Sequence, residues 1–345
     1  MKILLPFQDP YNRPLEYPIC SGGTESFCKS IYDNFDTEVY QVPIESVDLS
    51  IKEKDKIARS IINRAEEIGA DIIVSNFAQA IYSGKELINS HIPIMIISHI
   101  IYPMATCISR WNKAVDNGHS VFWVSKWQGK QYEKMAQRTN QRVVPISGYI
   151  NSSYCKVKPA MVESEYDCGT IGRCDNGKSP FKLKTMTKGE DIKSLVITSK
   201  TQYKKDLPYY NKHKDWDYVI WDKPYTEVME NISKCKTYFS TWDKETWGIT
   251  SMEALSCGIP VILNCDKDGD HASEIIPADK SHYIKIPKDN KDALVKAIKS
   301  FDNIDRKEIQ EATWEKHNQE QWKKDFKNSI DKTIDMFNNK RNMLV

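Results

Sequence analysis

The stretch Gly248-Ile-Thr-Ser-Met-Glu-Ala-Leu-Ser-Cys-Gly-Ile-Pro-Val-Ile-Leu-Asn264 decides how this chain folds. Its first part predicts a helix over Gly248–Cys257, which a glycine turn ends. The apolar run Pro260–Asn264 follows at once and predicts a buried strand. A helix that leads through a tight turn into a buried strand is the repeating step of a parallel α/β sheet.

This step recurs along the chain in two series, which predicts two doubly wound sheets in tandem. The expected strands are Lys2–Phe7, Glu38–Val42, Asp71–Ser75, Ile94–Ser98, Ser120–Val124, Arg142–Ile146, Cys168–Gly172, Ser194–Ser199, Asp217–Trp221, Thr237–Thr241 and Pro260–Asn264. The expected helices are Thr24–Asn34, Lys52–Ile68, Trp111–Asn117, Lys126–Arg138, Pro180–Lys188, Tyr225–Lys234, Gly248–Cys257 and Lys291–Phe301, with one or two more in the tail Arg306–Asn339. We expect domains at 1–150 and 151–320, and a helix at 321–345 that packs back on the first domain.

Length and composition fit two domains of a soluble protein. The chain has 345 residues, 40% of them hydrophobic and 28% charged, which is enough apolar material for two cores and argues against disorder. The nine cysteines contain no Cys-x-x-Cys pair, so we expect a reduced, cytoplasmic protein without a disulfide framework. No segment has the composition of a membrane span or a secretion signal.

Two glutamates flank the start of the expected helix at Gly248. The amides of its first turn, from Thr246 through Trp247 and Gly248 to Ile249, offer hydrogen-bond donors and the positive end of a dipole to a phosphate or a sugar. Glu245 precedes this end and could accept hydrogen bonds from sugar hydroxyls, and Glu253 could reach a ribose diol.

The pattern of Glu245, Glu253 and the following Ala-x-x-x-Gly-x-Pro-Val-Ile resembles the signature of retaining glycosyltransferases of the GT-B fold, the group that includes sucrose and glycogen synthases. The resemblance implies two Rossmann-like domains that face a cleft, a UDP-sugar or similar donor, and no need for a metal. It also implies that the departing phosphate helps to deprotonate the acceptor, so no protein nucleophile is expected.

A second segment resembles the same group. Gly172-Arg173-x4-Lys178-x-Pro180 is similar to the turn that opens the second domain there, in which the arginine and the lysine hold the donor diphosphate. Two fixed cations at a strand end would offset the charge that grows on a departing nucleotide.

Three further features are candidates for the site or its surroundings. The loop glycines Gly22 and Gly23 would let the backbone approach a ligand, although a simple turn explains them as well. His99, at the end of an expected strand, is a candidate for sugar contact or proton transfer, or a structural histidine. Asp266–Asp270 lacks the glutamate that closes a calcium loop, so we interpret it as a polar loop.

Positive charge is concentrated in one part of the first half. Arg110–Arg142 holds seven cations and two anions, and four of the cations recur every four residues on one helix face. With Arg110 and Trp111 nearby, the stripe of Lys126, Lys130, Lys134 and Arg138 could bind the phosphates of double-stranded DNA or anionic lipid headgroups, or it is an ordinary basic face.

The acceptor is the open question. Ser256-Cys257-Gly258-Ile259-Pro260-Val261 and the Gly-Arg-x4-Lys turn resemble the phage α-glucosyltransferases that modify 5-hydroxymethylcytosine in DNA, so this base is our single best prediction. A glycan, a lipid-linked or a small-molecule acceptor is the alternative. A non-catalytic sensor of nucleotide sugars and a phosphorylase remain as other classes, and the missing Gly-x-Gly-x-x-Gly disfavours a dehydrogenase.

Overall fold

The computed structural model describes residues 1–7, 23–42, 50–75, 85–99, 105–125, 128–129, 142–143, 163–175, 178–200, 206–242, 248–265, 282–301 and 304–343, with backbone alone at 23–26, 85, 105–110 and 142–143. Contacts divide the chain into two compact units. The first unit comprises Met1–Ile146 and Glu320–Val345, and the second unit comprises Ser147–Gln319.

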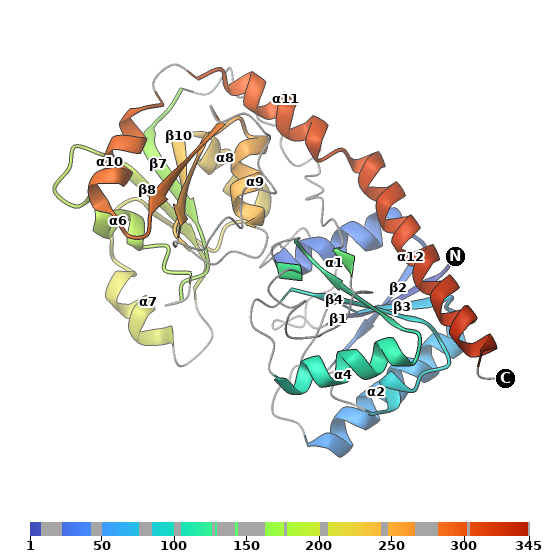
Figure 1. Cartoon of the computed structure of the whole chain (residues 1–345). Helices are drawn as coiled ribbons and strands as arrows, with labels where there is room; N and C mark the ends of the chain where they lie inside the picture. Colours follow the sequence, from blue (N-terminus) through green and yellow to red (C-terminus); the bar gives the residue numbers. More distant parts are fainter. Residues whose placement is uncertain are drawn as a thin grey trace. The chain divides into compact units, whose positions relative to one another are not determined.

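The first unit is built on a parallel sheet in the order β2-β1-β3-β4-β5-β6 (Figure 1). Its strands are β1 (Ile3–Phe7), β2 (Thr37–Gln41), β3 (Ile72–Ser75), β4 (Ile94–Ser98), β5 (Ser120–Trp123) and β6 (Arg142–Val143). Its helices are α1 (Gly23–Asn34), α2 (Ile51–Ile68), α3 (Lys85–Ile88), α4 (Ala105–Asp116) and α12 (Gln319–Asn342). Strands β1, β3 and β4 are buried along their whole length, as a sheet covered on both faces requires.

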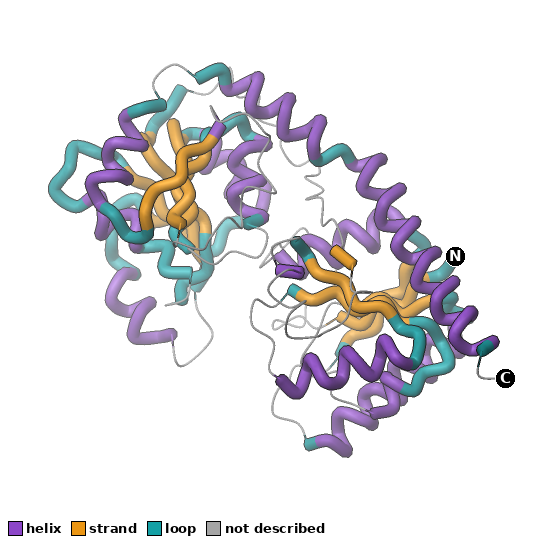
Figure 2. The backbone as a smooth tube through the Cα atoms, viewed as in Figure 1, coloured by secondary structure: helices purple, strands orange, loops and turns teal. Residues whose placement is uncertain are grey.

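The second unit is built on a parallel sheet in the order β12-β11-β10-β7-β8-β9 (Figure 2). Its strands are β7 (Tyr166–Ile171), β8 (Ser194–Thr198), β9 (Val219–Trp221), β10 (Cys235–Ser240), β11 (Val261–Cys265) and β12 (Tyr283–Pro287). Its helices are α6 (Lys182–Thr187), α7 (Leu207–His213), α8 (Tyr225–Ser233), α9 (Ile249–Ser256), α10 (Lys291–Lys299) and α11 (Arg306–Lys316).

In the described residues, apolar side chains from both faces of this second sheet form two large cores, beside a smaller cluster of Cys174, Phe181 and Val196. One core joins the sheet to α8, α9 and α11 through Met229, Ala254 and Ile309. The other joins it to α6 and α10 through Leu183 and Leu294. The prediction of two doubly wound α/β sheets is therefore confirmed, whereas β12, α3 and α7 were not expected.

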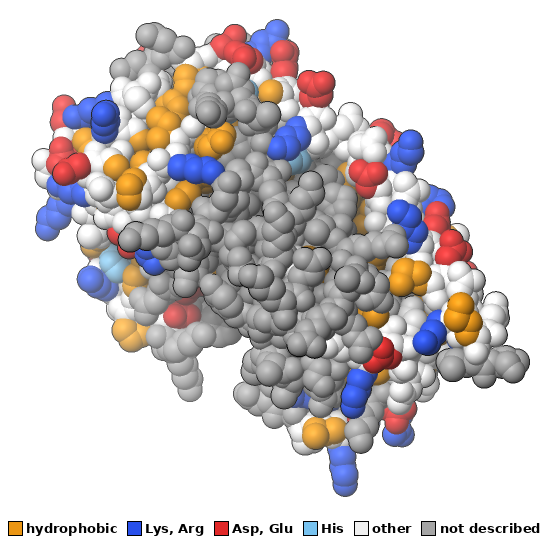
Figure 3. Space-filling view, viewed as in Figure 1, with side chains coloured by type: hydrophobic (Ala, Val, Ile, Leu, Met, Phe, Trp, Pro, Cys, Tyr) orange, Lys and Arg blue, Asp and Glu red, His pale blue; other side chains and the backbone are white. Residues whose placement is uncertain are grey.

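Helix α12 packs on the first unit through aromatic side chains. Trp322 and Phe326 stack with ring centroids 5.3 Å apart, and both meet Phe27 of α1 edge to face. Farther along, Phe337 stacks on His119 at 5.1 Å. The solvent side of the helix carries charges of both signs (Figure 3), which form pairs such as Lys327 with Asp331.

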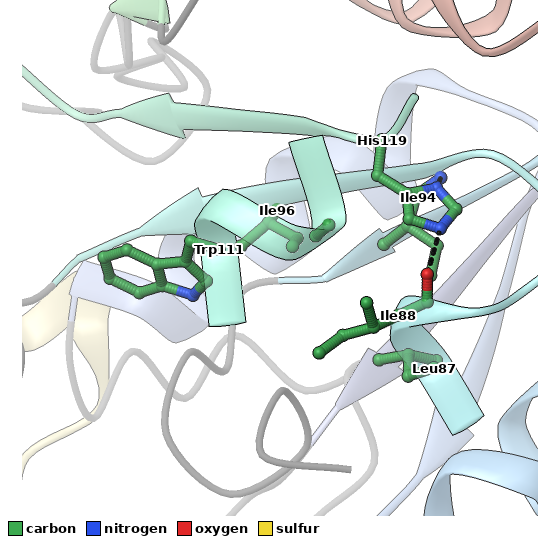
Figure 4. A pocket seen from close by; sticks show the side chains of 7 residues that line it. Leu87, Ile88, Ile94, Ile96, Trp111 and His119 are labelled. Carbon is green, nitrogen blue, oxygen red and sulfur yellow. Dashed lines mark hydrogen bonds between the residues drawn. The ribbon is translucent and has the colours of Figure 1, made fainter. Parts of the chain in front are cut away.

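His119 lies fully buried between β4 and α3. The Ile94 N–H donates to Nδ1 at 3.3 Å, so the proton is on Nε2, which donates to the Ile88 carbonyl at 3.1 Å (Figure 4). Trp111 lines a small apolar cavity beside this ring, whose volume of about 10 Å³ is at the lower limit for one water molecule. The cavity therefore belongs to the packing of the core.

The burial of His119 predicts a loss of stability in acid. Burial lowers its pKa from 6.5 to about 4, so the unfolded chain takes up a proton first as the pH falls. The stabilisation that this group contributes is complete at a pH above its pKa in the unfolded chain, and it is lost as the pH falls through its pKa in the folded protein. His119→Gln keeps one donor and one acceptor, so we expect the unfolding free energy to depend less steeply on pH between about 6.5 and 4. Urea titrations of both proteins across this pH range measure the unfolding free energy. The same pH dependence in His119→Gln and in the wild type would contradict the conclusion that His119 causes the loss of stability in acid.

Gly258 is required where α11 begins beside the end of α9. Its φ is +74°, and an added Cβ would lie 2.2 Å from the Arg306 carbonyl oxygen. Gly189 is a matched control, because its φ is +85° and a Cβ there would meet nothing within 4 Å. Gly189→Ala should cost about 1 kcal/mol in backbone strain, and Gly258→Ala about 1–3 kcal/mol more through the clash. If thermal unfolding shows the same loss of stability in Gly189→Ala and Gly258→Ala, the clash with the Arg306 carbonyl is easily relieved.

Candidate active site at the carboxyl edge of the second sheet

The second sheet has a topological switch point between β7 and β10. Numbered from β7, its strands run in the order 6-5-4-1-2-3, so the chain leaves β7 toward one side and β10 toward the other. In open α/β sheets, ligands bind in the crevice at the carboxyl ends of the strands beside such a point. The residues after Ile171 and after Ser240 are therefore the first candidates for a binding site.

The turn after β7 carries Arg173 and Lys178, and Asp175 lies between them in the sequence and contacts both residues. Gly172 donates its N–H to the Ile197 carbonyl at 3.1 Å, which fixes the start of the turn. Asp175 then accepts the Lys178 N–H at 2.6 Å through Oδ1, and its Oδ2 lies 3.4 Å from Nε of Arg173. The Arg173 side chain is 58% exposed, so its guanidinium stays available to an anion. The structure thus brings the two predicted diphosphate ligands onto one turn.

The end of β10 contacts this turn directly. The Thr241 hydroxyl donates to the Lys178 carbonyl at 2.7 Å, and the Lys178 ammonium lies 3.7 Å from the ring centre of Trp242. Neither Thr241 nor Trp242 was predicted, although both directly follow a predicted strand end. That position was the available signal.

A buried amide extends the contact to β11 and β12. Asn264, 3% exposed, donates through Nδ2 to the Thr241 carbonyl at 2.9 Å and to Asp289 Oδ1 at 3.0 Å. Its Oδ1 accepts the Asp289 N–H at 2.9 Å. Burial alone would raise the pKa of Asp289, but hydrogen bonds from Lys182 and Asn264 outweigh it and lower that pKa.

Helix α9 begins next to the same edge. Gly248 is its N-cap with φ 68° and ψ 48°, a left-handed conformation that glycine adopts without strain. Among the residues that the structure describes, no side chain forms a capping hydrogen bond with this helix. Thr250 accepts the Tyr238 hydroxyl at 2.7 Å, which ties the first turn to β10. In the described part of the chain, the buried Ser251 hydroxyl has no hydrogen-bond partner. The helix start therefore presents polar groups that a ligand could satisfy.

Some of the remaining residues that were predicted to bind the donor lie in the described structure, and others lie outside it. Gly248 and Ile249 lie at the start of α9, and the Glu253 side chain is 7% exposed within it. Gly23 begins α1 in the first unit. Outside the described residues lie Gly22, Glu245, Thr246 and Trp247.

His99 directly follows β4 in the first unit and is half-buried. Its ring meets Phe27 edge to face, with centroids 5.5 Å apart. Although part of the residue is accessible, the protein around the imidazole lowers its pKa to about 4 by burial. The ring is therefore neutral at pH 7 and suited to hydrogen bonding rather than to charge.

The structure corrects one predicted acceptor residue. Trp111 is 1% exposed, and its indole packs edge to face on Trp123 at 5.4 Å. Trp111, Ala114 and Val115 are spaced as the apolar face of α4, which turns this tryptophan into the core. The prediction that Trp111 contacts a partner is therefore wrong. The Arg110 side chain and the stripe Lys126, Lys130, Lys134 and Arg138 lie outside what the structure describes.

The described residues also bear on whether the chain binds a metal or crosses a membrane. Among the described residues, no group of three or more His, Cys, Asp or Glu side chains is arranged to hold a metal ion. None of the described helices is long and apolar enough to cross a membrane.

Part of the second unit matches a known protein family. Residues 199–316, about a third of the chain, match the family model of glycosyl transferases group 1. The second unit carries a glycosyl transferases group 1 domain. The match begins after Arg173 and Lys178, and it includes the α9–β11 step and the Asn264 network. The prediction of a glycosyltransferase is confirmed at the level of this domain. No curated protein matches the chain by sequence.

Solved structures share the fold of the whole chain. A glycosyltransferase from Rickettsia africae ESF-5 has a TM-score of 0.71 at 12% identity and covers 98% of this chain and 99% of its own. HepE (Alr3699) of Anabaena, solved in complex with UDP, has a TM-score of 0.67 at 16% identity over 96% of this chain and 100% of its own. Sucrose-phosphate synthase from Thermosynechococcus elongatus has a TM-score of 0.67 at 12% identity, over 95% of this chain and 98% of its own. The chain therefore has the GT-B fold.

Proposed function

We propose that the chain is a glycosyltransferase that takes a sugar from a UDP-sugar bound at the carboxyl edge of the second sheet. The observation that carries the proposal is the pair Arg173 and Lys178, held on one turn at the switch point of a 3-2-1-4-5-6 sheet. The glycosyl transferases group 1 domain and the UDP in the HepE structure support the choice of donor.

Each candidate residue has a role in this proposal. Arg173 and Lys178 bind the diphosphate, and Glu253 binds the ribose from α9. Glu245 positions the transferred sugar, and the first-turn amides hold the remaining polar groups. Gly22, Gly23 and His99 belong to the first unit, for which we propose contacts to the sugar. The remaining donor-binding residues are Thr246, Trp247, Gly248 and Ile249.

The transfer would retain the configuration at the anomeric carbon. The bond from that carbon to the β-phosphate oxygen breaks, and the acceptor oxygen forms the new bond on the same face. The acceptor proton goes to the departing phosphate, whose growing charge the two cations stabilise. The residues require no metal for this step, because Arg173 and Lys178 supply positive charge. Product NMR would distinguish retention from inversion.

Removing either cation tests the donor site. We expect Arg173→Ala and Lys178→Ala to lower turnover of UDP-glucose by roughly 100-fold, because each removes charge that stabilises the leaving group. Lys236→Ala is the matched control, since this exposed lysine lies near the start of β10 and pairs with Asp167. Near-normal turnover and UDP affinity in both test variants would refute the diphosphate assignment.

For the acceptor we propose 5-hydroxymethylcytosine in DNA. The excess of cations between Arg110 and Arg142 supports a polyanionic partner, and the resemblance to phage α-glucosyltransferases supports the base. A glycan, a lipid-linked or a small-molecule acceptor is the alternative. A protein that binds UDP-sugars without turnover is the alternative of another class, and a turnover assay excludes or establishes it.

A labelled-donor assay tests the acceptor. With labelled UDP-glucose, we expect label to enter hydroxymethylated DNA and not the unmodified duplex of the same sequence. DNA binding should weaken steeply as salt rises, because lysines and arginines displace counterions from phosphates. Donor hydrolysis without transfer to either duplex would reject the DNA acceptor and leave the donor site standing.

A further inference from the structure

Trp242 lies two residues after the end of β10, beside the turn that carries the two cations. Its indole ring is approached by the Lys178 ammonium, with Nζ 3.7 Å from the ring centre. This is close for a cation and an aromatic face, which attract each other within about 6 Å.

The backbone of Lys178 is fixed on both sides by other contacts. Its N–H is bound by Asp175 from within the turn, and its carbonyl is bound by Thr241 from the end of β10. Thr241 is itself held in place by the buried amide of Asn264. The β10 end thus holds Lys178 at two points, at the carbonyl through Thr241 and at the ammonium through Trp242.

A lysine side chain is flexible, so a fixed backbone alone does not fix its charge. An ammonium group has three N–H donors, and the attraction between its charge and a ring face does not require any of them to be shared with a hydrogen-bond acceptor. The contact thus restricts where the charge lies without removing its capacity to bind phosphate.

We propose that Trp242 is a positioning residue, which holds the Lys178 ammonium where the diphosphate of the donor binds. This inference rests on the proposed role of Lys178 in donor binding. An indole is the aromatic side chain that attracts a cation best, so the size and type of the ring should both matter.

A double-mutant cycle with UDP as the ligand tests the coupling. Trp242→Leu should weaken UDP binding, measured by calorimetry, by about two- to fivefold, the value of one such contact. Trp242→Phe keeps an aromatic ring that attracts a cation less strongly, so its UDP affinity should lie between that of the wild type and that of Trp242→Leu. In a Lys178→Met background, which keeps the stem and removes the charge, Trp242→Leu should change the UDP affinity no further. Trp314→Phe, on α11, is the control for loss of a tryptophan elsewhere in the unit.

The outcomes separate the two proposals. Unchanged UDP affinity in Lys178→Met would overturn the proposed role of Lys178 itself. If Lys178→Met weakens binding but Trp242→Leu weakens it equally in both backgrounds, Trp242 acts independently and the positioning role is rejected. Tighter UDP binding in Trp242→Leu would show that the ring competes with phosphate, which also rejects it. Trp242→Phe keeps the test valid if the leucine variant does not fold.

Discussion

The hydrogen bond from Thr241 to the Lys178 carbonyl is the contact on which the arrangement of the candidate site depends. It joins the ends of β10 and β7, the two neighbouring strands from which the chain continues in opposite directions. At such a point the connections that follow the two strands diverge and leave a crevice at the strand ends. One threonine therefore fixes the position of a turn 63 residues earlier in the sequence.

The buried amide of Asn264 makes that contact rigid. A buried amide is costly unless its donors and acceptor are satisfied, and Asn264 has partners for both. Through Asp289 and Lys182 the same network reaches the first turn of α6, which follows the cation turn. Four strand ends and one helix thus share a single set of hydrogen bonds. The network therefore fixes the backbone of the turn that carries Lys178 before any ligand binds, as a preorganised site requires.

Much of the fold was predictable from sequence, because buried parallel strands are continuous apolar runs, and the observed strands lie within a few residues of the predicted ones. Arg173 and Lys178 were predictable because their spacing is local. Trp242 and Asn264 were not, because their roles come from contacts with residues far away in sequence. Trp111 shows the opposite error, because the sequence predicted a role in binding for a residue that the structure buries in the core. Its neighbours suggested a basic surface, but the helical spacing with Ala114 and Val115 determines which way it faces.

In the proposed mechanism the acceptor proton leaves with the phosphate, and the low pKa of His99 is compatible with that proposal. A general base works best when its pKa is near the working pH, and burial holds the pKa of His99 at about 4. An imidazole of that pKa is a weak base at neutral pH. A terminal phosphate has a pKa of about 6 and is the stronger base, and the β-phosphate acquires this basicity as its bond to the sugar breaks. A neutral His99 can still accept or donate a hydrogen bond to a sugar hydroxyl. The environment of this ring therefore suits hydrogen bonding better than proton transfer, which is compatible with the proposed mechanism, in which the leaving group itself removes the proton.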